Sequence, residues 1–78
     1  MPEGTTLLIH NHDEPGVVGM VGTLLGEAGV NISRMQLALS PERKEAAMLV
    51  NVSGNCTDEV IQKLRNQKHV ITAQLVEL

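Results

Sequence analysis

The sequence predicts an α+β sandwich in which two helices cover one face of a four-stranded antiparallel sheet, in the order βαββαβ. Two observations predict this fold. Four segments rich in β-branched or alternating apolar residues have the pattern of strands, and two segments repeat their apolar residues with the period of a helix. Each helical segment lies between two strand segments, and right-handed crossovers then place both helices on the same face.

The first strand is expected over residues 5–10, which are β-branched and apolar, and the polar turn of residues 13–16 ends it. Pro15 suits the first helical position, because its fixed backbone angle and missing N–H cost nothing there. The apolar residues of the helix recur at i, i+3, i+4 and i+7: Val17, Val18, Val21, Leu24, Leu25 and Ala28. Gly29 follows, where glycine favours a left-handed cap.

A hairpin is expected next. Residues 30–39 form a strand in which Met35, Leu37 and Leu39 alternate onto one face, and residues 46–52 form its partner. The polar segment 40–45, which contains a proline, is the turn between them.

The second helix begins after Thr57, whose hydroxyl can accept from a backbone N–H. Acidic residues at its start and basic residues towards its end suit the helix dipole: Asp58 and Glu59, then Lys63, Arg65 and Lys68. Its apolar stripe consists of Val60, Ile61 and Leu64, and residues 70–76 form the last strand. These elements complete a ferredoxin-like fold.

The length of 78 residues allows a single domain, which we expect over residues 5–78 after a leader or linker remnant at residues 1–4. The chain contains no Phe, Tyr or Trp, so its core is built from aliphatic residues and methionine. Small domains offset such a shortfall by oligomerising or by staying attached to a larger protein. We therefore expect a second copy or a parent protein.

Charge and cysteine content restrict the partners. The net charge is −3 and no aromatic residue is available for base stacking, which argues against nucleic-acid binding. One cysteine cannot form an internal disulfide, and no apolar run has the length of a membrane span. A cytoplasmic location without membrane contact is the expectation.

Polar groups gather near the start of the first helix. Asn11 and Asp13 follow the first strand, backbone N–H groups are available at Gly16 and Val17, and Asn31 opens the second strand. Together they suit a zwitterionic small molecule: a carboxylate accepts from an ammonium group, and helix N–H groups hold a carboxylate. In the plainer alternative, Asp13 caps the helix and Asn31 is a turn residue.

The first helix is rich in glycine. Gly19, Gly22 and Gly26 share a face, and glycine inside a helix costs up to about 1 kcal/mol relative to alanine. Close approach of a ligand or of another backbone would compensate, and both explanations stay open. The spacing does not match a phosphate-binding loop.

Catalysis and metal binding lack a supporting pattern. His10, His12, Cys56 and His69 do not have the spacing of a metal site, and no acid, base and nucleophile converge. We expect no catalytic residue, no metal and no cofactor.

The motif Asn-x-Asp-x-Pro-Gly-Val at residues 11–17, with Val-Asn-Ile at residues 30–32, resembles the ACT domain. The helix sequence Val-Gly-Thr-Leu-Leu-Gly-Glu at residues 21–27 leans towards the C-terminal regulatory ACT domain of D-3-phosphoglycerate dehydrogenase. The ACT segment of the iron–sulfur L-serine dehydratases is the nearest alternative. The resemblance covers nearly the whole chain.

This resemblance implies a regulatory domain that pairs side by side with a second copy and binds an amino acid, L-serine in the dehydrogenase, at the interface. Asn11 and Asp13 match the polar positions of the first loop, Gly16 and Val17 the backbone-binding positions, and Asn31 the group across the interface. Family members often carry Asn where this chain has Asp13, and a carboxylate cannot donate to a carboxylate. A pure dimerisation module is the remaining alternative.

Overall fold

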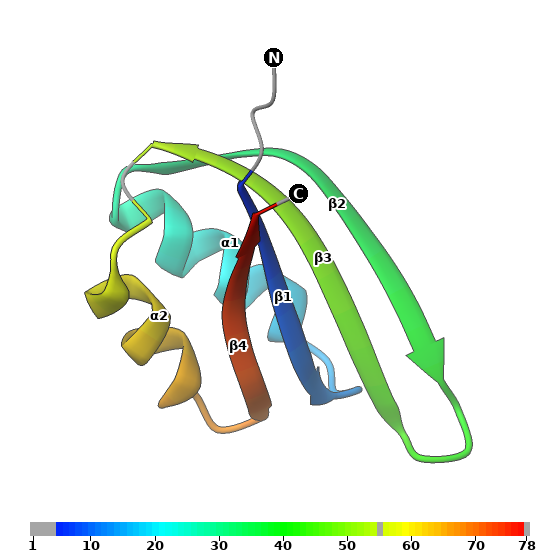
Figure 1. Ribbon diagram of the computed structural model, residues 1–78. Helices are drawn as coiled ribbons and strands as arrows, with labels where there is room; N and C mark the ends of the chain where they lie inside the picture. Colours follow the sequence, from blue (N-terminus) through cyan, green and yellow to red (C-terminus); the bar gives the residue numbers. More distant parts are fainter. Residues whose placement is uncertain (1–4, 55, 78) are drawn as a thin grey trace.

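The computed structural model describes residues 5–54 and 56–77, and it has the predicted element order (Figure 1). The strands are β1 (Thr5–His12), β2 (Val30–Ser40), β3 (Glu45–Gly54) and β4 (Val70–Glu77), and the helices are α1 (Val17–Glu27) and α2 (Asp58–Arg65). The sheet is antiparallel in the order β2-β3-β1-β4, and both helices lie on one side of it. The ferredoxin-like prediction is confirmed. The leader predicted at residues 1–4 lies outside the described residues.

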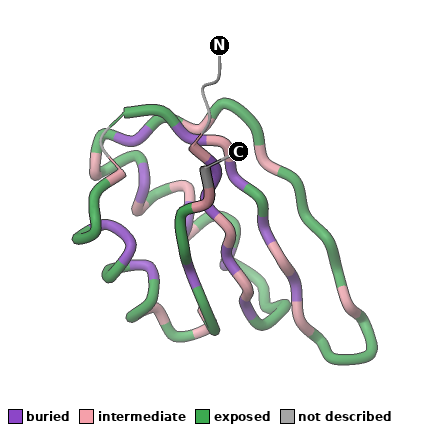
Figure 2. The backbone as a smooth tube through the Cα atoms, in the orientation of Figure 1, coloured by how far each residue is buried: buried purple, intermediate pink, exposed green. Residues whose placement is uncertain are grey.

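The core lies between the sheet and the helices. Alternate residues of β1 and β3 are buried towards the helices, as the period of a strand requires (Figure 2). Fully buried side chains are aliphatic or methionine: Leu7, Ile9, Val21, Leu25, Met48, Val50 and Leu64. Each stabilises the fold by about 1.5–3 kcal/mol, so the absence of aromatic residues leaves a small core without large contributors.

Two predicted boundaries around the first loop were wrong. β1 continues to His12 instead of ending at residue 10, because Asn11 and His12 pair with Ala46 and Glu45 of β3. α1 begins at Val17, so Pro15 is not its first residue. Gly16 has a left-handed φ of +90°, a conformation outside the helical range that most residues avoid, and it serves as the N-cap.

The second helix matches its prediction closely. The Thr57 hydroxyl accepts from the Val60 N–H at 3.4 Å, and acidic and basic residues occupy the first and last turns. Lys68 lies beyond the helix, which ends at Arg65. Among the described residues no helix is long and apolar enough to cross a membrane.

The β2–β3 hairpin extends past the helices (Figure 1), and two of its apolar side chains are largely exposed. Leu37 and Leu39 lie on one face of the sheet, as predicted. They pair with buried Met48 and Ala46, so this is the helix side, yet they are 50% and 60% exposed. Val18 of α1 is 43% exposed. We call Leu37 and Leu39 the apolar strip; both lie on β2, an open edge of the sheet.

Replacing Thr57 by alanine is expected to lower the free energy of unfolding by about 1 kcal/mol, because α2 loses the side-chain cap at its N-terminus. Urea titration followed by circular dichroism measures this difference. Thr57→Ser keeps the acceptor oxygen and should stay near the wild-type value. Equal losses in both variants would contradict the capping role.

Candidate functional site

The loop of residues 13–16, between β1 and α1, is held at its base by two backbone hydrogen bonds. The His12 N–H donates to the His69 carbonyl and the Asp13 N–H donates to the Lys44 carbonyl, both at 2.8 Å. One bond connects the loop to the start of β4 and the other to the β2–β3 turn. The loop therefore has a fixed position that does not depend on its own side chains.

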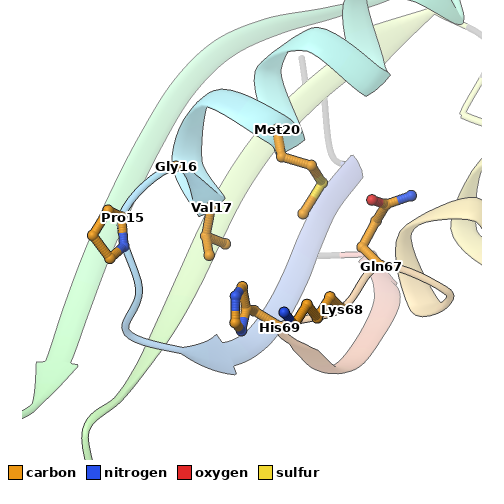
Figure 3. A pocket seen from close by; sticks show the side chains of 7 residues that line it. All are labelled: Pro15, Gly16, Val17, Met20, Gln67, Lys68 and His69. Atoms are coloured by element: carbon orange, nitrogen blue, oxygen red, sulfur yellow. The ribbon is translucent and has the colours of Figure 1, made fainter.

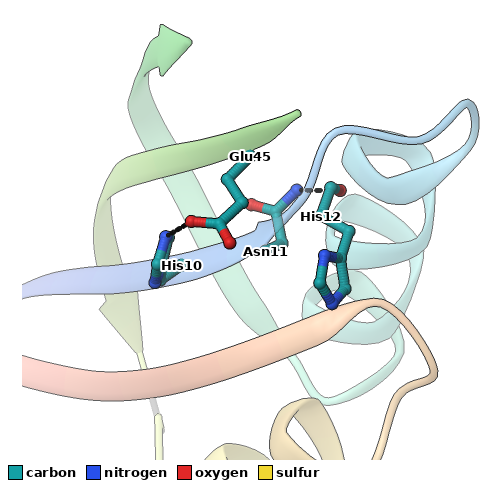
Figure 4. Close-up of polar contacts among 4 residues, drawn as sticks. All are labelled: His10, Asn11, His12 and Glu45. Atoms are coloured by element: carbon teal, nitrogen blue, oxygen red, sulfur yellow. Dashed lines mark hydrogen bonds and ion pairs between the residues drawn. The ribbon is translucent and has the colours of Figure 1, made fainter. Parts of the chain in front are cut away.

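Asn11 lies just before this loop and is buried, with only 3% of its surface exposed. Its side-chain amide donates to the His12 carbonyl at 2.8 Å (Figure 4). Its carbonyl oxygen, Oδ1, is also buried and has no hydrogen-bond partner among the described residues. An unsatisfied buried acceptor costs about 1–3 kcal/mol, so this oxygen is a place where an added donor is favourable.

Asp13 does not cap α1, contrary to the plainer of the two interpretations. The N-cap is Gly16, and no side chain makes a capping hydrogen bond at this helix. Asp13 is exposed, and its carboxylate makes no hydrogen bond within the described part of the chain. Its negative charge is therefore available to a cationic group.

The first turn of α1 presents backbone N–H groups. The Val17 N–H, predicted to be unpaired, donates to the Glu14 carbonyl over a long 3.4 Å. The N–H groups of Gly16, Val18 and Gly19 have no backbone acceptor in residues 5–54 and 56–77. Together with the positive end of the helix dipole, they form an environment that favours an anion such as a carboxylate.

A hollow of about 150 Å³ opens beside Gly16 and Val17 on the side that faces α2 and β4 (Figure 3). It is large enough for several water molecules. The close-up shows the side chains that line it: Pro15, Val17, Met20, Gln67, Lys68 and His69. Lys68 thus adds a cation near the helix start, a contribution that sequence analysis did not identify.

The histidines make contacts within the fold. His10 Nε2 lies 2.8 Å from Glu45 Oε1 (Figure 4). The His12 and His69 rings contact each other edge to face, with 6.5 Å between their ring centroids. No group of three potential metal ligands occurs within the described residues. Burial raises the pKa of the Cys56 thiol, which disfavours the reactive thiolate.

Asn31 lies at the opposite end of the sheet from the loop. It pairs with Ser53, whereas Asn11 pairs with Ala46, seven residues earlier on β3. At about 3.3 Å per residue the separation is roughly 23 Å along the strand. One copy of the chain therefore brings Asn11, Asp13 and the start of α1 together, but not Asn31.

Lys44 is a second residue that sequence analysis missed. Its φ of +56° is unusual for a residue other than glycine, and it closes the turn in which the Arg43 N–H donates to the Ser40 carbonyl at 3.1 Å. The Lys44 carbonyl accepts the hydrogen bond from the Asp13 N–H. A turn of this length favours a left-handed residue before the second strand, which is the signal that was available.

The chain is similar to a known domain family. The sequence model of the ACT domain matches residues 5–69. The chain is 30% identical over 77 residues, 99% of its length, to D-3-phosphoglycerate dehydrogenase of Bacillus subtilis, of which it spans 15%. It is 43% identical over 58 residues, 74% of its length, to D-3-phosphoglycerate dehydrogenase of Mycobacterium bovis, of which it spans 11%.

Solved structures show the same fold. The ACT domain of the GTP pyrophosphokinase of Chlorobium tepidum superimposes with a TM-score of 0.72 at 17% identity, covering 92% of this chain and 95% of that one. The element order, the sheet topology and the family match lead to one conclusion. This chain belongs to the ACT domain family.

Proposed function

We propose that this chain is a non-catalytic regulatory domain that binds a small amino acid, with L-serine as first candidate, between two copies. We further propose that it controls a cytoplasmic D-3-phosphoglycerate dehydrogenase. The chain spans 15% and 11% of the length of the two dehydrogenases compared above. The observation that carries the proposal is the buried Oδ1 of Asn11, an acceptor without a partner among the described residues.

The groups around the loop suit the two charges of an amino acid. An ammonium group can donate to the exposed Asp13 carboxylate and to Asn11 Oδ1. The carboxylate of the same molecule can accept from the unpaired N–H groups at the start of α1.

Pairing of two copies through β2 would complete this site. The end of β2 pairs with Glu45, which also pairs with His12, so the end of β2 and the loop lie at the same end of the sheet. A two-fold axis beside the middle of β2 makes the β2 strands of the two copies antiparallel to each other. The start of β2 in the second copy, with its Asn31, then lies at the same end of the sheet as the loop of the first copy.

The surface beside β2 supports such pairing. β2 is an open edge, and it carries the apolar strip of Leu37 and Leu39. A ligand held between two copies acts on a catalytic domain only through a difference in affinity for its active and inactive arrangements. An interfacial site supplies that difference, because it exists only where the two copies meet.

Titrating L-serine into the chain by isothermal calorimetry is expected to give saturable heat, with glycine, L-alanine and L-valine as comparison ligands. Asp13→Ala should weaken binding about tenfold or more, because a charge-assisted hydrogen bond is worth about 1.5–3 kcal/mol. Glu14→Gln removes a neighbouring exposed charge and should change affinity little. No heat with any amino acid, on a folded dimer, would leave only the dimerisation module.

Asn11→Val separates a binding role from a structural one. Valine fits a strand and removes both the unpaired acceptor and the hydrogen bond to the His12 carbonyl, so the two effects on the unfolding free energy without ligand should largely offset each other. Affinity for the amino acid should fall about tenfold or more. Unchanged affinity in the folded variant would contradict a role for Asn11 as a ligand acceptor.

Two glycine variants test the pairing. Gly19 and Gly22 both have open space where a Cβ would lie, and alanine at either stabilises the helix itself by up to about 1 kcal/mol. Gly22 lies one turn after Val18, on the side of α1 towards β2, whereas Gly19 points away from the sheet. In sedimentation equilibrium, Gly22→Ala should weaken the dimer and Gly19→Ala should not. Equal dimer dissociation constants for the two variants would exclude close packing of α1 between the two copies.

A further inference from the structure

The sheet has two open edges, β2 and β4, and they differ in one respect. An open edge strand presents unpaired N–H and C=O groups and favours pairing with another chain. On β4 one of these groups is occupied. The side chain of Arg65, the last residue of α2, donates through Nε to the carbonyl of Ala73 at 2.9 Å.

The effect of this hydrogen bond depends on the side of β4 to which the Ala73 carbonyl points. Carbonyl groups along an antiparallel strand point alternately to its two sides, and β4 has a neighbour, β1, on one side only. The Ala73 carbonyl accepts from a side chain of α2, so we place it on the open side. Arg65 therefore occupies an acceptor in the middle of β4 that an added strand would need.

The residues around Ala73 would otherwise make this edge attractive to another strand. Ile71 and Leu75, two positions to either side, are 41% and 37% exposed. A hollow of about 380 Å³ lies between Arg65 and residues 71–74. An exposed strand edge with flanking apolar side chains is prone to edge-to-edge association unless a charged group blocks it.

We propose that Arg65 closes the β4 edge against a strand from a second copy of this chain and so confines self-association to β2. Without the guanidinium each copy would present two pairing edges. Pairing through two different edges does not close on itself, so copies would add without limit instead of stopping at a dimer. This role is separate from effector binding and holds whether or not the chain binds an amino acid.

The test compares Arg65→Ala with the wild type by sedimentation velocity over a wide concentration range. The weight-average mass of the variant should rise with concentration to about twice the wild-type value or more. Hydrogen exchange should show new protection of β4 amides, while β2 amides keep their wild-type rates. Lys63→Ala is the matched control, since it removes one exposed cation from the same helix and should leave the mass unchanged.

Two further variants keep the result interpretable. Arg65→Met retains the aliphatic stem and loses the donor, and it replaces Arg65→Ala if that variant does not fold. Gln74→Lys, combined with either, places a new charge on the exposed side of β4 and should restore the wild-type mass. A folded Arg65 variant with wild-type mass and exchange rates overturns the proposal, as does growth that Gln74→Lys fails to reverse.

Discussion

The candidate site depends on how the carboxyl end of β1 is held. Two backbone bonds of 2.8 Å, from His12 to His69 and from Asp13 to Lys44, end the strand and direct the chain to Gly16. With the loop fixed, the first N–H groups of α1 remain open to an anion. Because backbone atoms make both bonds, the side chain at position 13 can change without moving the helix start. An exchange between Asp and Asn at this position therefore changes the chemistry of the site and not its shape.

The parts of the structure that depend on local pattern were predictable from the sequence. The period of the apolar residues indicated the six elements. The Thr57 cap was also predictable, because it involves only residues of the same helical turn. The end of β1 was predicted two residues early, because its last residues are polar and are held by distant partners on β3. The role of Lys44 and the distance between Asn11 and Asn31 follow from strand register, which a single sequence shows only indirectly.

Charge narrows the ligand class in the proposed site. Asp13 and Glu14 lie just before the positive end of α1, where they compete with a bound carboxylate for the same electrostatic environment. An ammonium group on the ligand offsets this competition. A ligand with a second carboxylate would meet Asp13 without compensation. The arrangement therefore favours neutral amino acids over acidic ones.

Assembly and ligand binding are linked in such a domain. With a site shared by two copies, every contribution of the ligand to affinity also stabilises the pair, and the reverse holds by the same thermodynamic linkage. The small aliphatic core makes this contribution a large fraction of the total stability. Pairing through β4 would place Asn31 of one copy far from the loop of another, and such assemblies would not respond to the ligand. If Arg65 closes β4 as proposed, the contact that stabilises the pair and the contact that binds the ligand would share the β2 interface.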